Sequence, residues 1–202
     1  MITIVDYGMG NLRSVQRALE LYYPDISITS DRAVIEEAQA LVLPGVGAFG
    51  DAIEELKSRD LLHLLKQQII MKTTLGICLG MQLLFEQSEE SPGVEGLGIL
   101  KGEVKKLTPA DSIRVPHTGW NRLQPVKEPY FTGFAYFNHT YYCEPKTSDL
   151  ILSWSLHGRK IPAIIFKDHI LATQFHPEKS KETGQSILRY WTDIVKIQDE
   201  KL

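Results

Sequence analysis

The first half of the chain alternates short apolar runs with amphipathic segments. The apolar runs are Ile2–Val5, Ile26–Thr29, Ala40–Leu43 and Thr73–Ile77. Uninterrupted apolar strands separated by helices are typical of a parallel sheet that is covered on both faces. The intervening segments predict helices, and one of them places Leu12, Val15, Leu19 and Tyr22 on a single face. The predicted helices span residues 11–22, 31–37 (with Asp31 as the N-cap), 49–57 and 60–71.

The second half has a different pattern. A polar loop over 87–93, a strand over 98–107 and a connection over 109–116 precede the compact polar and aromatic segment 117–121. Further strands are predicted over 134–142, 151–156, 163–167 and 170–174, with a hairpin turn at 167–169, and a final helix over 181–196. This half therefore predicts an antiparallel extension of the sheet. Without an internal repeat or a linker, residues 1–202 read as a single domain.

Composition excludes several classes of protein. A net charge of −3, with 43% hydrophobic and 23% charged residues, is ordinary for a globular chain and gives no strong field for nucleic acid or a membrane. No apolar run is long enough to span a bilayer, and the N-terminal residues lack the pattern of a signal peptide. Two cysteines, Cys78 and Cys143, do not form a disulfide framework. We therefore expect a cytoplasmic protein whose thiols stay reduced.

Cys78 lies in the most informative segment. Gly76-Ile77-Cys78-Leu79-Gly80 follows an apolar strand and opens an apolar-periodic helix that reaches Phe85. This is the pattern of a nucleophile elbow, in which a sharp turn exposes the central side chain at the end of a sheet. A buried structural cysteine is the usual alternative for a lone Cys. The flanking glycines favour the nucleophile, provided that a base lies elsewhere in the chain.

A glycine-rich loop, residues 44–50, follows the third strand. It allows three interpretations: a phosphate site, a plain turn or an oxyanion hole. No Lys-Ser/Thr pair follows the loop as in a P-loop, and the cysteine elbow favours the oxyanion hole. The expected donors are the N–H of Leu79, directly after the nucleophile, and an N–H of the Gly45-Val46-Gly47 stretch, because Pro44 has no N–H.

His176 is the candidate base. It ends an apolar strand, and Glu178 follows two residues later, so the imidazole can face a thiol on one side and a carboxylate on the other. Alone, His-Pro-Glu is as compatible with a turn as with catalysis. His63 is expected at the surface or in packing, and His157 and His169, beside turn residues, are expected to be solvated. Together Cys78, His176 and Glu178 indicate acyl transfer. No cluster has metal-ligand spacing, so we expect neither a metal nor a cofactor.

The elbow motif with His176-Pro177-Glu178 resembles class I glutamine amidotransferases, over nearly the whole chain. That resemblance implies a flavodoxin-like α/β sheet and a Cys-His-Glu triad. Four further segments, 6–12, 44–47, 116–121 and 136–141, resemble the family of glutaminase subunits of imidazole glycerol phosphate synthases. Asn138 departs from this pattern, because the family usually carries a small apolar residue there.

The resemblance also implies roles for individual residues. Gln82 and Glu90 match positions that bind the substrate glutamine, and Thr140 and Tyr141 match a segment that binds it through backbone groups. The positions near the interface with a cyclase partner, a (β/α)₈ barrel, are Asn11, Trp120, Tyr136 and Lys179. Ammonia released at Cys78 would pass through that barrel. The products would be imidazole glycerol phosphate and aminoimidazole carboxamide ribotide, in histidine biosynthesis.

The sequence leaves three other functions open. A paralogous amidotransferase would feed ammonia to a different acceptor, for example in sugar amidination, and only its partner would reveal this. A Cys peptidase or deglycase of similar fold is disfavoured by Gln82 and the Pro-Gly-Val-Gly loop. A non-enzymatic binding module is disfavoured by the intact triad.

Overall fold

The computed structural model describes residues 1–109, 113–126 and 131–199. Its strands form two sheets within those ranges, and the larger has the order β2-β1-β3-β4-β12-β11-β10-β7-β8. The first five of these strands pair in parallel. They are β1 (Ile2–Val5), β2 (Ile26–Thr29), β3 (Ala40–Leu43), β4 (Thr73–Ile77) and β12 (Ile170–Thr173). This order matches the 2-1-3-4-5 order of flavodoxin-like folds and confirms the predicted fold class.

The other four strands of the large sheet pair antiparallel, as the second half of the sequence predicts. They are β7 (His117–Pro125), β8 (Gly133–His139), β10 (Ile151–His157) and β11 (Arg159–Lys167). Asp168, at the predicted turn between β11 and β12, has the positive φ of 55° that such a tight turn requires.

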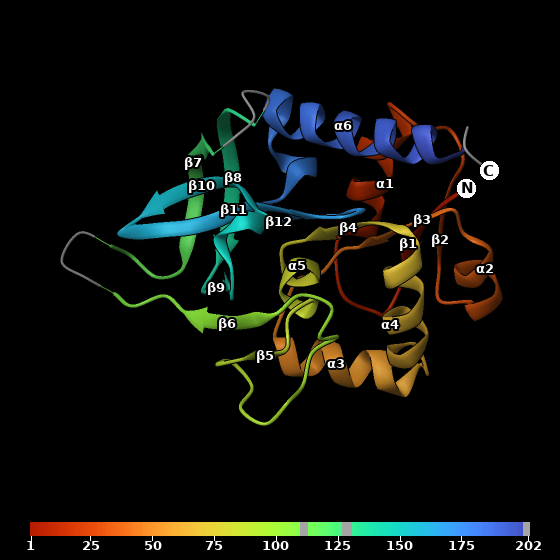
Figure 1. Cartoon of the computed structure of the whole chain (residues 1–202), viewed down its shortest axis with the longest axis horizontal. Helices are drawn as coiled ribbons and strands as arrows, with labels where there is room; N and C mark the ends of the chain where they lie inside the picture. The colour runs from red at the N-terminus through yellow and green to blue at the C-terminus, as the bar shows by residue number, and fades with distance from the viewer. Residues whose placement is uncertain (110–112, 127–130, 200–202) are drawn as a thin grey trace.

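Helices cover both faces of the parallel part of the sheet (Figure 1). α1 (Leu12–Glu20) and α6 (Lys181–Asp199) lie on one face, over a core that contains Ile4, Val42 and Trp191. α3 (Phe49–Ser58) and α4 (Leu62–Met71) lie on the other face, over Val5 and Leu41, and α2 (Arg32–Glu37) packs against α4. Successive strand residues thus bury their side chains on opposite faces. Among the described residues, no helix is long and apolar enough to cross a membrane.

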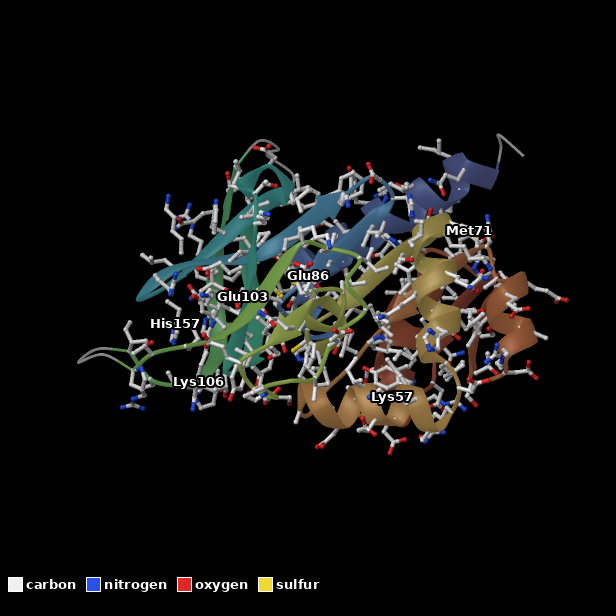
Figure 2. All side chains as sticks on the ribbon, turned by 60° about the horizontal axis from the view of Figure 1, so that its bottom comes forward. Lys57, Met71, Glu86, Glu103, Lys106 and His157 are labelled. Carbon is white, nitrogen blue, oxygen red and sulfur yellow. The ribbon has the colours of Figure 1, made fainter. Side chains whose placement is uncertain are left out.

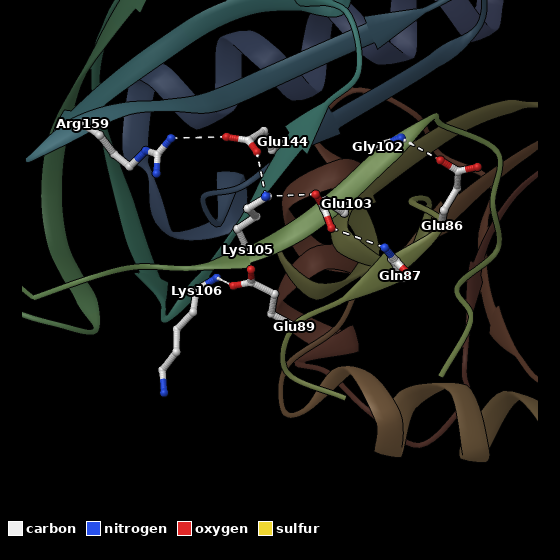
Figure 3. Close-up of polar contacts among 9 residues, drawn as sticks. All are labelled: Glu86, Gln87, Glu89, Gly102, Glu103, Lys105, Lys106, Glu144 and Arg159. Atoms are coloured by element: carbon white, nitrogen blue, oxygen red, sulfur yellow. Dashed lines mark hydrogen bonds and ion pairs between the residues drawn. The ribbon is translucent and has the colours of Figure 1, made fainter. Parts of the chain in front are cut away.

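A smaller sheet, of β5 (Gln87–Ser88), β6 (Gly102–Lys106) and β9 (Tyr141–Pro145), packs beside this core. Charged side chains lie along this small sheet, among them Glu86, Glu103 and Lys106, which Figure 2 labels. Lys105 contacts Glu103 at 2.9 Å and Glu144 at 3.3 Å, and Glu144 also contacts Arg159 at 3.2 Å (Figure 3).

The same region is fixed through backbone groups. The backbone N–H of Lys106 donates to Glu89 at 2.7 Å (Figure 3). Exposed ion pairs stabilise little. The Lys106–Glu89 hydrogen bond has a positional role, because it holds the segment that carries Glu90 beside β6.

Several predicted boundaries were wrong. Residues 117–121, expected as a compact segment, begin the nine-residue strand β7. The strand expected over 134–142 is two strands, β8 and β9, in different sheets. The strand expected from residue 98 begins at Gly102, β11 begins at Arg159 rather than 163, and β5 lies inside the expected polar loop. Residues 110–112 of the expected connection lie outside the described residues.

Candidate active site

Cys78 stands at the carboxyl end of β4 in a strained backbone conformation. Its φ of 53° and ψ of −106° are rare for a residue with a side chain, and they define the sharp turn into α5 (Leu79–Leu83). Gly80 permits the turn, because a Cβ there would lie 1.7 Å from the carbonyl oxygen of Leu43. α5 has only five residues, shorter than the helix expected to reach Phe85.

His176 reaches the same place from the neighbouring strand. β12 pairs in parallel with β4, with Thr173 opposite Ile77, so both chains leave the sheet at one edge. The Nδ1–H of His176 donates to Oε1 of Glu178 at 2.9 Å, and these side chains are only 5% and 2% exposed. The structure therefore brings Cys78, His176 and Glu178 together in the predicted arrangement.

The charge of His176 follows from its surroundings. Burial lowers its pKa, but hydrogen bonds and charge attraction from Cys78 and Glu178 outweigh burial and raise the pKa to about 10. The imidazole is therefore cationic at neutral pH. A cationic imidazole beside a thiol favours the thiolate–imidazolium pair that cysteine nucleophiles use.

A cavity of about 220 Å³ opens above Cys78. Cys78, His176 and Leu79 line it, together with Val46 and Gly47 from the predicted oxyanion loop. Leu79 is the first residue of α5, where backbone N–H groups have no partner within a helix. The arrangement therefore places candidate N–H donors and the thiol around one small space.

The glycine-rich loop is anchored at its base and open at its tip. The Tyr7 hydroxyl donates to the carbonyl of Pro44 at 2.6 Å, and Gly45 is buried beneath it. Val46 is 44% exposed, and Gly47 has a φ of +109° that favours glycine. Of the three predicted loop residues, Val46 and Gly47 thus face the cavity, and Gly45 supports them.

All four residues implied to bind glutamine line the cavity: Gln82, Glu90, Thr140 and Tyr141. The side-chain N–H groups of Gln82 donate to the carbonyl of Tyr141 at 2.9 Å and to Oε1 of Gln174 at 3.4 Å. Glu90 accepts the N–H of Phe49 at 2.7 Å, which ties the cavity wall to the start of α3.

Sequence reasoning missed several residues of the site. Gln174 is buried and lies 3.9 Å from the sulfur of Cys78, and its polar side chain within an apolar strand was the available signal. His139 and Pro116 also line the cavity. Asn138 lines it as well, on the exposed side of β8, where it accepts a hydrogen bond from Thr118 at 3.1 Å. A polar residue at that exposed position needs no change in packing.

Three of the residues implied for the partner interface gather on one surface. The rings of Trp120 and Tyr136 lie edge to face at 6.1 Å, and Lys179 lies 5.9 Å from the Tyr136 ring. Lys181, which sequence reasoning did not single out, lies 5.6 Å from the Trp120 ring. Asn11 is exposed at the N-cap of α1, which packs beside the turn that carries Lys179.

The remaining histidines differ in part from expectation. His63 is exposed. His157 and His169 are half-buried rather than solvated, and each contacts a backbone carbonyl, of Arg114 at 2.8 Å and of Ile69 at 3.0 Å. Within the described ranges, no group of three or more His, Cys, Asp or Glu side chains is arranged to hold a metal ion.

Comparison with known proteins places this site in a family. Residues 3–193 match the family model described as glutamine amidotransferase class-I. The chain is 47% identical to imidazole glycerol phosphate synthase subunit HisH of Caldanaerobacter subterraneus subsp. tengcongensis, covering 97% of this chain and 99% of that one. It is 42% identical to the protein of the same name from Bacillus subtilis (strain 168), over the full length of both.

Solved structures agree on the fold. A crystal structure of a glutamine amidotransferase superposes with a TM-score of 0.77 at 18% identity, covering 97% of this chain and all of that one. A chain from the structure of PurLQS from Thermotoga maritima has a TM-score of 0.66 at 15% identity, with 98% and 97% covered. The chain is therefore a member of the class-I glutamine amidotransferases and belongs to the family of the imidazole glycerol phosphate synthase subunit HisH.

Proposed function

We propose that this chain, as one domain over residues 1–202, is a glutaminase subunit that converts L-glutamine to glutamate and ammonia. The observation that carries the proposal is the constellation at one sheet edge. A strained cysteine lies beside an imidazole whose pKa is raised to about 10, and that imidazole bonds a buried carboxylate. This arrangement suits attack on a carboxamide at neutral pH.

The proposed reaction has two halves. The Cys78 thiolate attacks the carboxamide carbon of glutamine, and the resulting oxyanion is held by the N–H of Leu79 and an N–H of the Val46–Gly47 loop. As the C–N bond breaks, His176 gives its proton to the leaving nitrogen, so that ammonia departs and a thioester remains. Water then attacks the thioester while His176 takes its proton, which releases glutamate and restores the thiolate.

Residues around the reacting atoms have supporting roles in this proposal. Glu178 holds the imidazole in orientation and stabilises its cationic form. Gln82, Glu90, Thr140 and Tyr141 bind the rest of glutamine, and their position on the cavity wall supports that assignment. The chemistry requires neither a metal nor a cofactor.

We further propose that the ammonia passes to a (β/α)₈-barrel cyclase subunit in a cytoplasmic heterodimer, which makes imidazole glycerol phosphate and aminoimidazole carboxamide ribotide in histidine biosynthesis. The names of the relatives support this, because they describe one component of that synthase. Trp120, Tyr136, Lys179 and Asn11 are the proposed contacts. The exposed Trp120 ring, which packs against the half-buried Tyr136 beside lysines, is suited to a docking surface.

The test is the activity of the complex with each nitrogen source. Copurification from the native cell identifies the partner, and a partner other than a cyclase would instead indicate a paralogous amidotransferase. In the complex, Cys78→Ala should abolish turnover with glutamine and retain turnover with ammonium salt at high pH. Loss of both activities in a folded, assembled complex would contradict the proposed division of labour.

A further inference from the structure

Two buried histidines face each other behind the glutamine cavity. His117 on β7 and His139 on β8 are opposite each other in the antiparallel ladder, and they are 3% and 6% exposed. Nδ1 of His117 lies 3.0 Å from Nε2 of His139. One of these two nitrogens must donate and the other must accept, so the pair has a direction.

The surrounding groups fix that direction. Nδ1 of His139 lies 2.8 Å from the carbonyl oxygen of Tyr141, which can only accept, so this nitrogen carries the proton. At the other end, Nε2 of His117 lies 3.0 Å from Nδ2 of Asn121.

The orientation of the Asn121 amide is fixed independently. Its Nδ2 donates to the carbonyl of Leu156 at 2.9 Å, and its Oδ1 accepts the N–H of Arg122 at 2.7 Å. Nε2 of His117 therefore accepts from Asn121, and every hydrogen in the chain points toward Tyr141. Both rings carry a single proton, on Nδ1.

Burial keeps both rings neutral. The His117 ring stacks between Phe137, with centroids 4.5 Å apart, and His157, at 4.0 Å. Burial, followed by the proximity of His139 and His157, lowers the pKa of His117 to about 3, and burial lowers the pKa of His139 to about 4. A second proton on His139, at Nε2, would make this nitrogen the donor to Nδ1 of His117. The His117 proton would then lie on Nε2, where it would face the N–H of Asn121, a second donor.

The chain of hydrogen bonds ends in the cavity wall. The carbonyl of Tyr141 also accepts from Nε2 of Gln82 at 2.9 Å, so both of its acceptor positions are filled from within the protein. The second N–H of Gln82 goes to Gln174 at 3.4 Å. With both N–H groups engaged, Gln82 has its carbonyl oxygen left to accept a hydrogen bond from a ligand.

We propose that His117 and His139 are positioning residues: a neutral relay from Asn121 to the carbonyl of Tyr141 that holds Gln82 with its oxygen available to an N–H donor of the substrate. The proposal deepens the glutaminase function above and rests on it for the identity of the ligand. The relay also begins on β7, the strand that carries Trp120, so the cavity wall and the candidate docking strand are joined by one hydrogen-bonded chain.

The kinetic test separates hydrogen bonding from space filling. His139→Phe keeps a ring of similar size and removes the donor to Tyr141, whereas His139→Asn is smaller but can place an amide N–H near the lost Nδ1–H. In the complex with its partner, His139→Phe should raise the KM for glutamine about tenfold, with kcat changed much less, because a buried carbonyl loses one partner. The KM of His139→Asn should lie much closer to that of the wild type.

His157→Phe is the matched control. It keeps the stack on His117 and removes only a contact to Arg114, so the KM for glutamine should remain unchanged. If His139→Phe has a lower KM for glutamine than His139→Asn, or if neither variant changes KM, the two histidines serve only in packing and the proposal is overturned.

A spectroscopic test requires no substrate, no variant and no activity measurement. In the isolated chain labelled with ¹⁵N-histidine, long-range ¹H–¹⁵N correlation at pH 7 should show both rings protonated at Nδ1 and unprotonated at Nε2. An Nε2-protonated or doubly protonated ring for either residue would overturn the relay. Absence of glutamine hydrolysis in the wild-type complex would instead overturn the proposed function, and this ring measurement would still decide the relay.

Discussion

Replacement of Glu178 by Gln is the most discriminating change within the triad. It preserves the shape of the side chain and its ability to accept from His176, and it removes the negative charge. The side chain is only 2% exposed, and its Oε1 lies 2.9 Å from Nδ1 of His176. Water therefore cannot reach the imidazolium to stabilise it in place of the lost carboxylate. One oxygen, Oε2, is buried without a partner among the described residues. The amide of the variant would therefore also bury a new unpaired donor if its N–H₂ took that place.

The magnitude follows from the kind of hydrogen bond that changes. A hydrogen bond to a charged group contributes about 1.5–3 kcal/mol, against about 0.5–1.5 kcal/mol for a neutral one. The difference, roughly 1–2 kcal/mol, would be lost from the step in which His176 becomes cationic, the attack of water on the thioester, and it corresponds to a decrease of about 5- to 30-fold in kcat. Cys78→Ala, which removes the nucleophile, should be far more severe.

The assay is glutamate production by the complex at saturating glutamine, for wild type, Glu178→Gln and Glu37→Gln. Glu37 is an exposed carboxylate at the end of α2 and serves as the matched control, with no change expected. A kcat of Glu178→Gln within twofold of wild type would refute the role of the carboxylate charge. A loss as complete as that of Cys78→Ala would refute the view that Glu178 only orients and stabilises the base.

Three further outcomes are expected. Gly80→Ala should lower the free energy of unfolding by about 3 kcal/mol or more in urea titrations, because its Cβ would lie 1.7 Å from the carbonyl of Leu43; unchanged stability would contradict the elbow geometry. Trp120→Ala should weaken partner binding about thirtyfold by calorimetry, whereas Leu21→Ala, also an exposed apolar residue, should not; equal effects would argue against the docking surface. Because the folded-state pKa of His176 is raised to about 10, its contribution to stability is complete below the unfolded pKa of about 6.5 and is lost as pH rises through 10. The stability difference between wild type and His176→Ala should therefore shrink from pH 6 to pH 10, and a difference that grows would contradict this charge assignment.

The parallel half of the fold was predictable because its strands are short apolar runs, most of them buried on both faces. β1, β2 and β3 have the bounds that the apolar runs predict, and Asp31 caps α2 through the N–H groups of Ala33 and Val34. In such strands and helices, hydrophobic periodicity and capping act locally and agree with the tertiary structure.

The antiparallel half depends on contacts that a local pattern does not contain. β7 is exposed at several positions and contains Gly119, so its sequence lacks a continuous apolar run. Residues 134–142 form one aromatic, strand-like stretch, but the chain passes from one sheet to the other at Thr140. That passage depends on pairing with β6, which is distant in sequence.

The candidate site also has residues that local motifs predict and residues that depend on the tertiary structure. Cys78 and His176 were identified from short motifs whose backbone geometry is local. Gln174 and the His117–His139 pair contact their partners through side chains from segments distant in sequence, and only the folded structure brings these together.

Covalent labelling tests the central claim most directly. A diazo-ketone analogue of glutamine should modify Cys78, which lines the cavity beside His176. It should spare Cys143, which is fully buried and whose pKa burial raises far above the usual range. Digestion and mass spectrometry of the labelled, native chain should give one adduct, on the peptide containing Cys78, coincident with loss of glutaminase activity. An adduct on Cys143, or inactivation without modification of Cys78, would contradict the assignment of Cys78 as the nucleophile.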